Sequence, residues 1–302
     1  MTELAPRPRH TRGGRRALPY LIPASAVFGV FLFFPLLAVT ALSFTEWNLI
    51  SPLPRFVGLD NYAELLTSAD FGQTLLQTAY YLALAFIGNF LVPVLLAVLT
   101  LGAGPKLLAC YRTVLFLPAV VSSAVGAIVW QYLYLPDGGP INAALDILGW
   151  HGANWLNDPT TVIPAVAAAA SWNSFGFNYI VALGGLSGIP AGVREAARLD
   201  GAGGWVMLTR ITLPMARPTL VFVATAALLQ ALPHAFVPLQ IMTGGGPDNA
   251  SNNLFFDVYR TAFQFFQIGQ SAAGSVVLIA LLSAAAILQY RLMDRRSTYD
   301  LV

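Results

Sequence analysis

The chain has 302 residues, 57% of them hydrophobic and only 10% charged, with a mean hydropathy of +0.67. Soluble domains carry about 25% charged residues, so a soluble fold of this length could not bury so much apolar surface, and the bilayer must be its solvent. The net charge of +2, the single Cys110 and three widely separated histidines give no indication of nucleic-acid binding, an internal disulfide or a metal site.

Six segments are apolar and long enough to cross a bilayer, which takes about 20 residues of helix. In chain order they cover residues 17–45, 74–101, 112–135, 162–185, 218–240 and 270–291. The first follows an Arg-rich tail, 1–16, and such a tail also precedes the apolar core of a secretory signal peptide. That core is usually about 7–15 residues long. Because the run here is longer and no small-x-small cleavage site follows it, we expect an uncleaved span.

Prolines interrupt the predicted spans. In a helix interior each proline removes a backbone hydrogen bond and kinks the helix. Neighbouring helices must then supply partners for the freed carbonyl groups, because lipid offers none. The prolines in question are Pro23, Pro35, Pro93, Pro118, Pro164, Pro233 and Pro238.

Positive charge predicts the orientation of the spans. Fourteen of the sixteen Lys and Arg residues lie on one side: in the N-terminal tail, in or at the edge of the loops after the second and fourth spans, or at Arg291 and in the C-terminal tail, 292–302. The other two, Arg55 and Arg260, lie on the opposite side. Since short cytoplasmic loops carry the excess of Lys and Arg, both termini and the loop at 187–214 are predicted to be cytoplasmic.

The predicted spans lack the groups that several membrane activities need. None contains Asp or Glu, which argues against a proton relay but leaves open a sodium-coupled carrier. No phosphate-binding loop of the form G-x-x-x-x-G-K-[ST] is present. Only His234 could serve an intramembrane enzyme as a base. If transport is active, its energy must therefore come from another subunit; a membrane scaffold or accessory remains a third possibility.

The loop at 187–214 is a polar island in this apolar chain. Pro190 suits the first turn of a helix, and the charged residues after it lie at helical spacing. Asp200 can cap a second helix at about 202–211, which Pro214 would end. Gly201 permits a sharp turn between the two helices. Such a pair could be gripped by a soluble protein, or it could simply rest on the lipid headgroups.

The same loop resembles the EAA loop of binding-protein-dependent ABC importer permeases, the element that docks into a cleft of the cytoplasmic ATPase. One departure is Leu208, where relatives often carry an aromatic residue; since Leu is still apolar, we expect docking to be retained. The matching residues, which the resemblance marks as ATPase-coupling, are Glu195, Ala196, Ala197, Asp200, Gly201, Ala202, Ile211, Leu213 and Pro214.

Further motifs extend the resemblance to the carbohydrate branch of these permeases over most of the chain. They are Phe56-Val57-Gly58-Leu59-Asp60-Asn61-Tyr62, Leu117-Pro118, Gly139-Pro140-Ile141-Asn142 and Thr243-Gly244-Gly245-Gly246-Pro247. The C-terminal run from Ser271 to Leu278, followed by Gln289-Tyr290-Arg291, is most similar to the A-type permease for sn-glycerol-3-phosphate uptake.

The resemblance implies an all-α integral membrane protein, a type I ABC importer permease bundle of six transmembrane helices with a cytoplasmic coupling-helix loop. It implies a second, homologous permease subunit, a pair of ATPase subunits that bind the ATP, and an external substrate-binding protein. The chain itself would hold no cofactor and perform no chemistry. Its place would be the bacterial plasma membrane, and its cargo sn-glycerol-3-phosphate, its diesters or a related sugar, with a disaccharide or oligosaccharide as the alternative.

A polar solute crossing lipid needs hydrogen-bond partners at membrane depth. The fifth span supplies Gln230 and His234, which lie four residues apart and so share a helix face. The competing interpretation is that such residues bond neighbouring helices together or anchor at the interface. The full set of candidate pathway residues is Gln230, His234, Asn173, Asn178, Trp172 and Asn89.

The external loops, 46–73 and 136–161, carry polar and aromatic residues that could contact the binding protein. Ordinary surface polarity is the simpler explanation for them. The residues are Trp47, Asp60, Asn61, Asn142, Trp155 and Asp158.

Overall fold

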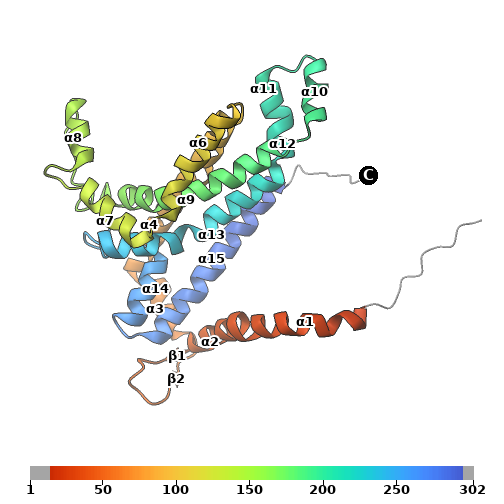
Figure 1. Ribbon diagram of the computed structural model, residues 1–302. Coiled ribbons are helices and arrows are strands. Elements are labelled where there is room, and N and C mark those ends of the chain that lie inside the picture. Colours follow the sequence, from red (N-terminus) through yellow and green to blue (C-terminus); the bar gives the residue numbers. More distant parts are fainter. Residues whose placement is uncertain (1–13, 295–302) are drawn as a thin grey trace, which may run out of the picture.

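The computed structural model describes residues 14–294, and almost all of its regular structure is helical (Figure 1). Four continuous helical stretches within this range are long and apolar enough to cross a membrane: Tyr20–Leu42, Ala69–Thr100, Arg217–Met242 and Ile268–Met293. The number rises to six if each of two bent helix pairs counts as one span. Most of the N-terminal tail and of the C-terminal tail, including five of the counted arginines, lies outside the described residues.

The N-terminal half contains two long helical rods joined by a short hairpin. The first rod consists of α1 (Gly14–Phe28), the π turn η1 (Gly29–Phe33) and α2 (Phe34–Leu42). The second consists of α4 (Ala69–Phe86), the π turn η2 (Ile87–Leu91) and α5 (Val92–Thr100). Between them lie β1 (Thr45–Glu46), β2 (Arg55–Phe56), which pairs antiparallel with β1, and α3 (Asp60–Thr67).

The remaining elements follow in chain order. They are α6 (Pro105–Phe116), the 3₁₀ turn η3 (Leu117–Val120), α7 (Ser123–Leu133), α8 (Pro140–Ile147), α9 (Val162–Ser187), α10 (Ala191–Leu199), α11 (Gly204–Val206), the π turn η4 (Met207–Thr212), α12 (Leu213–Met215), α13 (Arg217–Met242), α14 (Leu254–Phe263) and α15 (Ile268–Asp294). Helices α10 and α11 lie at one end of the molecule, whereas the β hairpin, α3 and α14 lie at the other (Figure 1).

Helix α9 is the centre of the bundle. It contacts the α4–α5 rod, α6, α7 and α13, and Tyr179, Leu183 and Leu186 on it are almost completely buried. Close approach depends partly on Gly176, where a Cβ atom would overlap the carbonyl oxygen of Leu115. By contrast, the α1–α2 rod buries none of its apolar window within this chain, so that surface must face lipid or another subunit.

The predicted span 112–135, in which Pro118 marks a kink, is sharply bent. The chain bends by 97° between the α6–η3 segment and α7. Pro118 cannot donate a backbone hydrogen bond, and Val121 adopts an extended conformation with ψ 132°. The Asn173 side chain on α9 donates from Nδ2 to the carbonyls of Pro118 and Val121, at 3.0 and 2.8 Å. The break is therefore held open by a tertiary contact that hydropathy does not reveal.

Helices overlap the other predicted spans, with their ends shifted by a few residues. Three of the four π or 3₁₀ turns in the described range have one cause. Each π turn ends with an i→i−5 hydrogen bond from the residue directly before a proline: Phe34 to Gly29, Val92 to Ile87, and Leu213 to Leu208. A proline has no N–H and its ring clashes with the carbonyl four residues earlier. Widening the preceding turn lets the helix continue through the proline.

The middle π turn shows where a freed carbonyl finds its partner. In an unbroken α-helix the carbonyl of Asn89 would accept from the N–H of residue 93, but residue 93 is proline. Instead Asn178 on α9 donates to this carbonyl from Nδ2 at 2.8 Å. This contact is what the proline pattern predicts for a helix in lipid.

We expect Asn178→Leu to destabilise the protein by about 1–3 kcal/mol, because it leaves the buried carbonyl of Asn89 without a donor. Thermal unfolding in detergent would measure the loss. Pro93→Ala restores a backbone N–H at position 93, so Asn178→Leu should cost much less in that background. An equal loss in both backgrounds would show that another Asn178 contact is responsible.

Candidate functional site

The loop between α9 and α13 forms a compact knob. Helix α10 begins at Ala191, so Pro190, which was expected in the first turn, is the N-cap instead. Arg194 donates from Nη2 to the carbonyls of Ser187 at 3.0 Å and Leu186 at 3.4 Å. These bonds fasten α10 to the end of α9, so the two helices, which meet at an angle of 59°, are held as one piece.

The turn after α10 confirms the role of Gly201 but corrects that of Asp200. Gly201 has φ +80°, a conformation that favours glycine. The Ala202 N–H donates to the Ala197 carbonyl and the Gly201 N–H to the Arg198 carbonyl, at 2.9 and 3.1 Å. This is the Schellman pattern that ends a helix. Asp200 is therefore the C-cap of α10 and not the N-cap of the next helix, which follows Gly203.

The second helix of the knob is longer than predicted. It runs through α11, η4 and α12 from Gly204 to Met215, so the expectation that Pro214 ends it is wrong. The π turn just before Pro214 accommodates the proline ring. Two large apolar side chains project from the knob without cover in this chain, Leu199 with 88% and Trp205 with 75% of the side chain exposed.

The residues assigned to coupling occupy different environments on the knob. Glu195, Ala196, Asp200, Gly201 and Pro214 are exposed. Ala202, Ile211 and Leu213 are half-buried, and Ala197, on α10 itself, is buried. The exposed group could touch a partner directly, whereas the others hold the shape of the knob.

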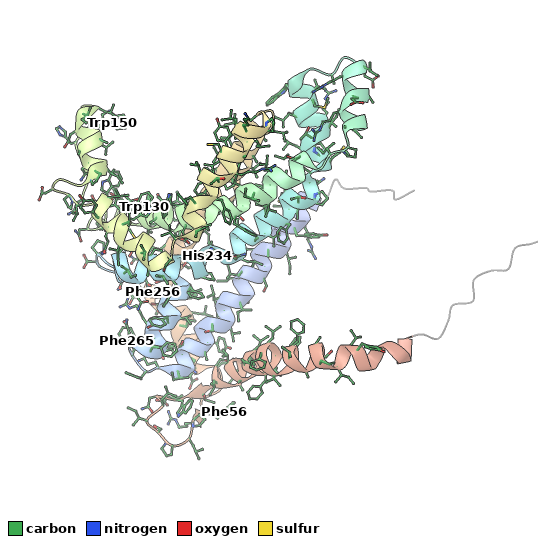
Figure 2. All side chains as sticks on the ribbon, viewed as in Figure 1. Phe56, Trp130, Trp150, His234, Phe256 and Phe265 are labelled. Atoms are coloured by element: carbon green, nitrogen blue, oxygen red, sulfur yellow. The ribbon has the colours of Figure 1, made fainter. Side chains whose placement is uncertain are left out.

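A cavity of about 390 Å³ lies where α9 and α13 face the η2 turn and the break after α6. His234 is near the middle of the bundle in Figure 2. The candidate pathway residues that line this cavity are Asn89, Asn173, Asn178, Gln230 and His234.

Trp172 is the one candidate that the structure does not bring to this cavity. Its ring packs edge-on against Trp130 with centroids 6.2 Å apart. Sequence reasoning missed Phe116, Ala119, Ser174 and Phe177, which also line the cavity. Helical spacing from Asn173 and Asn178 could have indicated Ser174 and Phe177. Phe116 and Ala119 could not be found, because the sequence marks a kink at Pro118 but not the size of the bend at η3 that brings them to the cavity.

The three asparagines of the cavity are engaged in bonds between helices, as the competing interpretation held. Asn89 accepts from Ser174 Oγ at 2.6 Å and donates to Ser171 Oγ at 3.2 Å. Asn173 and Asn178 donate to the freed carbonyls described above. Within the described residues, the side chains of Gln230 and His234 have no hydrogen-bond partner, and both are exposed to the cavity. These two are the groups free to meet a solute.

The chemistry of the cavity is that of an uncharged polar site. Amide, hydroxyl and imidazole groups line it together with the rings of Phe116 and Phe177, and none of its described lining residues is Asp, Glu, Lys or Arg. Amides and hydroxyls can both donate and accept hydrogen bonds. Such a lining suits a solute rich in hydroxyl groups.

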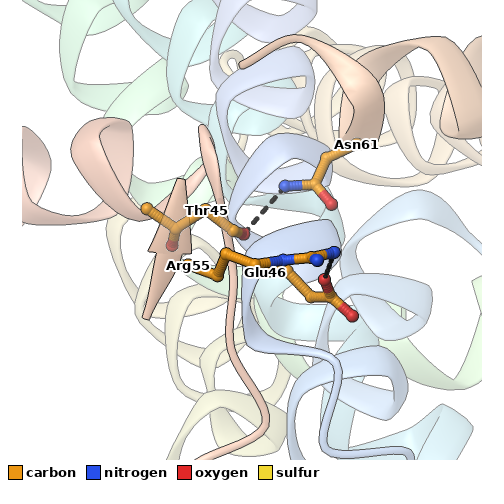
Figure 3. Close-up of polar contacts among 4 residues, drawn as sticks. All are labelled: Thr45, Glu46, Arg55 and Asn61. Atoms are coloured by element: carbon orange, nitrogen blue, oxygen red, sulfur yellow. Dashed lines mark hydrogen bonds and ion pairs between the residues drawn. The ribbon is translucent and has the colours of Figure 1, made fainter. Parts of the chain in front are cut away.

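Two asparagines of the segments predicted to form external loops, 46–73 and 136–161, have structural roles. Asn61 is 8% exposed and donates from Nδ2 to the Thr45 carbonyl at 2.9 Å, beside the ion pair of Arg55 and Glu46 (Figure 3). Asn142 is 4% exposed and accepts from Trp155 Nε1 at 2.7 Å. Neither contact with a partner nor surface polarity explains these two residues.

Comparisons with known proteins agree with this architecture. Residues 90–299 match the model of the family described as binding-protein-dependent transport system inner membrane component. The probable ABC transporter permease YurN of Bacillus subtilis (strain 168) is 32% identical over 91% of this chain and 96% of its own length. The sn-glycerol-3-phosphate transport system permease UgpA of Agrobacterium fabrum is 30% identical over 94% of this chain and 97% of its own length.

A solved structure of a bacterial ABC transporter that imports the acidic polysaccharide alginate aligns with a TM-score of 0.80 at 23% identity, covering 95% of this chain and 98% of the matched one. This likeness shows the fold. The ion-coupled carrier and the scaffold, which composition left open, do not fit these relatives. The chain belongs to the binding-protein-dependent transport system inner membrane components and is a non-enzymatic permease subunit of an ABC transporter.

Proposed function

We propose that this subunit passes its solute through the cavity that Gln230 and His234 line. An ATPase that docks on the α10–α12 knob would supply the energy for this transport. The observation that carries the proposal is the convergence of five candidate pathway residues from η2, α9 and α13 on one cavity. In the proposed orientation both termini and the knob are cytoplasmic, as the distribution of Lys and Arg favours.

The knob is suited to transmit movement as a rigid lever. Arg194 fastens α10 to α9, and α12 leads into α13 after the single residue Ala216. Closure of the ATPase pair would therefore displace α9 and α13 together, and these helices carry most of the cavity lining. Rigid-body switching of this kind would alternate the cavity between the two sides of the membrane.

The solute that the cavity supports best is an uncharged sugar or polyol. An anionic phosphate would require a cationic partner at membrane depth, and the described lining supplies only the imidazole of His234. The second candidate is sn-glycerol-3-phosphate or its diesters, which the similarity to UgpA permeases favours. A second, homologous permease subunit would complete the pathway, and an external binding protein would deliver the solute.

We expect Gly201→Val to abolish co-purification of the ATPase and solute-stimulated ATP hydrolysis. A β-branched residue at φ +80° is strained, so the turn that shapes the knob would change. Gly192→Ala is the matched control, because Gly192 is an exposed glycine of the same loop with open space around it. If Gly201→Val retains ATPase co-purification and solute-stimulated hydrolysis at the level of Gly192→Ala, the ATPase does not dock on this knob.

Gln230→Leu and His234→Leu should each lower the rate of solute uptake by up to about tenfold, since each removes hydrogen bonds worth about 0.5–1.5 kcal/mol to the passing solute. Uptake into proteoliposomes containing the full transporter would be measured, with Trp172→Phe as a control outside the cavity. Wild-type uptake in both leucine variants would contradict the pathway.

Competition would separate the two candidate solutes. Uptake of a labelled neutral disaccharide should be reduced by unlabelled neutral sugars and not by sn-glycerol-3-phosphate, because the lining provides no fixed positive charge. Stronger competition by sn-glycerol-3-phosphate would favour the phosphate instead.

A further inference from the structure

The loop of the β1–β2 hairpin, residues 47–54, forms an apolar tip that the rest of the described chain leaves exposed. Ile50 is 82% and Leu53 79% exposed. No residue of the tip is charged, and the charged residues that flank it, Glu46 and Arg55, form an ion pair with each other. We propose that this apolar tip inserts into the interfacial region of the bilayer and anchors the neighbouring span ends there.

The position of the apolar tip is fixed by the ends of two membrane-crossing stretches. Tyr20–Leu42 ends just before β1, and Ile268–Met293 begins beside the hairpin. The two are joined at this point, because the Ile268 N–H donates to the Trp47 carbonyl at 2.9 Å. Since an apolar span ends where the hydrocarbon of the bilayer ends, the hairpin lies at the boundary between acyl chains and headgroups.

The base of the hairpin is packed too tightly to swing away from that boundary. Asn61 on α3 donates from Nδ2 to the carbonyls of Ser43 and Thr45, both at 2.9 Å. At Gly269, in the first turn of α15, a Cβ atom would overlap the Thr45 carbonyl oxygen. The apolar tip is therefore held at a fixed height relative to α2 and α15.

Several polar groups of the apolar tip are paired within the tip itself. Asn48 Oδ1 accepts from the N–H groups of Ile50 and Ser51, at 3.1 and 2.9 Å. Trp47 donates from Nε1 to the Ser51 carbonyl at 2.9 Å. The two prolines of the tip have no N–H to satisfy. Because an unpaired polar group is costly away from water, this pairing lowers the cost of moving the tip out of bulk water.

Exposed aromatic side chains surround the apolar tip at the same end of the molecule. Phe265 and Phe266 are exposed just before α15 begins, and Phe56 is exposed on β2. Phe56 and Phe265 both lie at the end away from the α10–α12 knob (Figure 2). Elements that lie in the membrane interface turn Trp, Phe and Leu side chains toward the lipid, and this end of the protein has that composition.

Carboxylates beside the hairpin limit how deeply it inserts. Glu46, Asp60 and Glu64 line a cavity of about 700 Å³ next to the apolar tip. Charged side chains are costly in hydrocarbon, so this part of the hairpin must stay among water and headgroups. The apolar tip therefore reaches the interfacial region and not the centre of the bilayer.

Charge and continuity favour lipid over a soluble partner. The apolar tip follows directly on the α1–α2 rod, whose apolar window is not covered by the described chain. Soluble proteins are guided to their docking surfaces by complementary charge, and the tip offers none because its flanking charges neutralise each other. An uncharged surface that continues a membrane-crossing helix fits the bilayer.

Depth measurements with a nitroxide label would test the insertion in the complete transporter, reconstituted into liposomes of phosphatidylethanolamine and phosphatidylglycerol. In a Cys110→Ala background, Ile50→Cys places the label on the apolar tip, and Glu64→Cys places it on an exposed residue of the neighbouring cavity. Oxygen concentrates in lipid, whereas a nickel chelate stays in water. The ratio of relaxation by oxygen to relaxation by the chelate should be several-fold higher at position 50 than at position 64.

A charge on the apolar tip should reverse the insertion. With the label on Leu53→Cys, Ile50→Asp should lower the oxygen-to-chelate ratio several-fold, because a carboxylate draws the tip out of the lipid. Ile50→Leu, which keeps the apolar surface, should leave the ratio unchanged. Leu53→Cys also replaces Ile50→Cys in the first comparison if the latter variant does not fold.

Three results would overturn the proposal. Equal ratios at positions 50 and 64 would place the apolar tip in water. A label at position 50 that meets the chelate until the external binding protein is added would make the tip a docking surface for that protein. A label shielded from oxygen and chelate alike would place the tip against another permease subunit.

Discussion

The whole bundle depends on the need to pair every backbone polar group that lies in lipid. Prolines 35, 93 and 214 each remove a donor, and each follows a widened π turn that keeps its helix continuous. Where widening is not enough, an asparagine from α9 supplies the missing donor, as Asn178 does for the Asn89 carbonyl. Helix α9 is buried because its side chains complete the backbones of its neighbours.

This constraint also shapes the cavity that α9 and α13 line. Asn173 satisfies the carbonyls at the break between η3 and α7, and that break directs Phe116 and Ala119 toward the space between α9 and α13. The asparagines that suggest a pathway in the sequence are therefore largely committed to holding the cavity open. Gln230 and His234 on α13 take no part in such bonds among the described residues, and their side chains remain free to face the cavity.

Long apolar runs predicted the helical rods well, since burial in lipid imposes length and hydropathy on each span. The same signal could not reveal the 97° bend in 112–135, because the bend depends on Asn173 from a helix about 50 residues later. Asp200 was misassigned because Asp is both a good N-cap and tolerated before a C-terminal glycine. The positive φ of Gly201 decides between these readings, and only the fold fixes that angle.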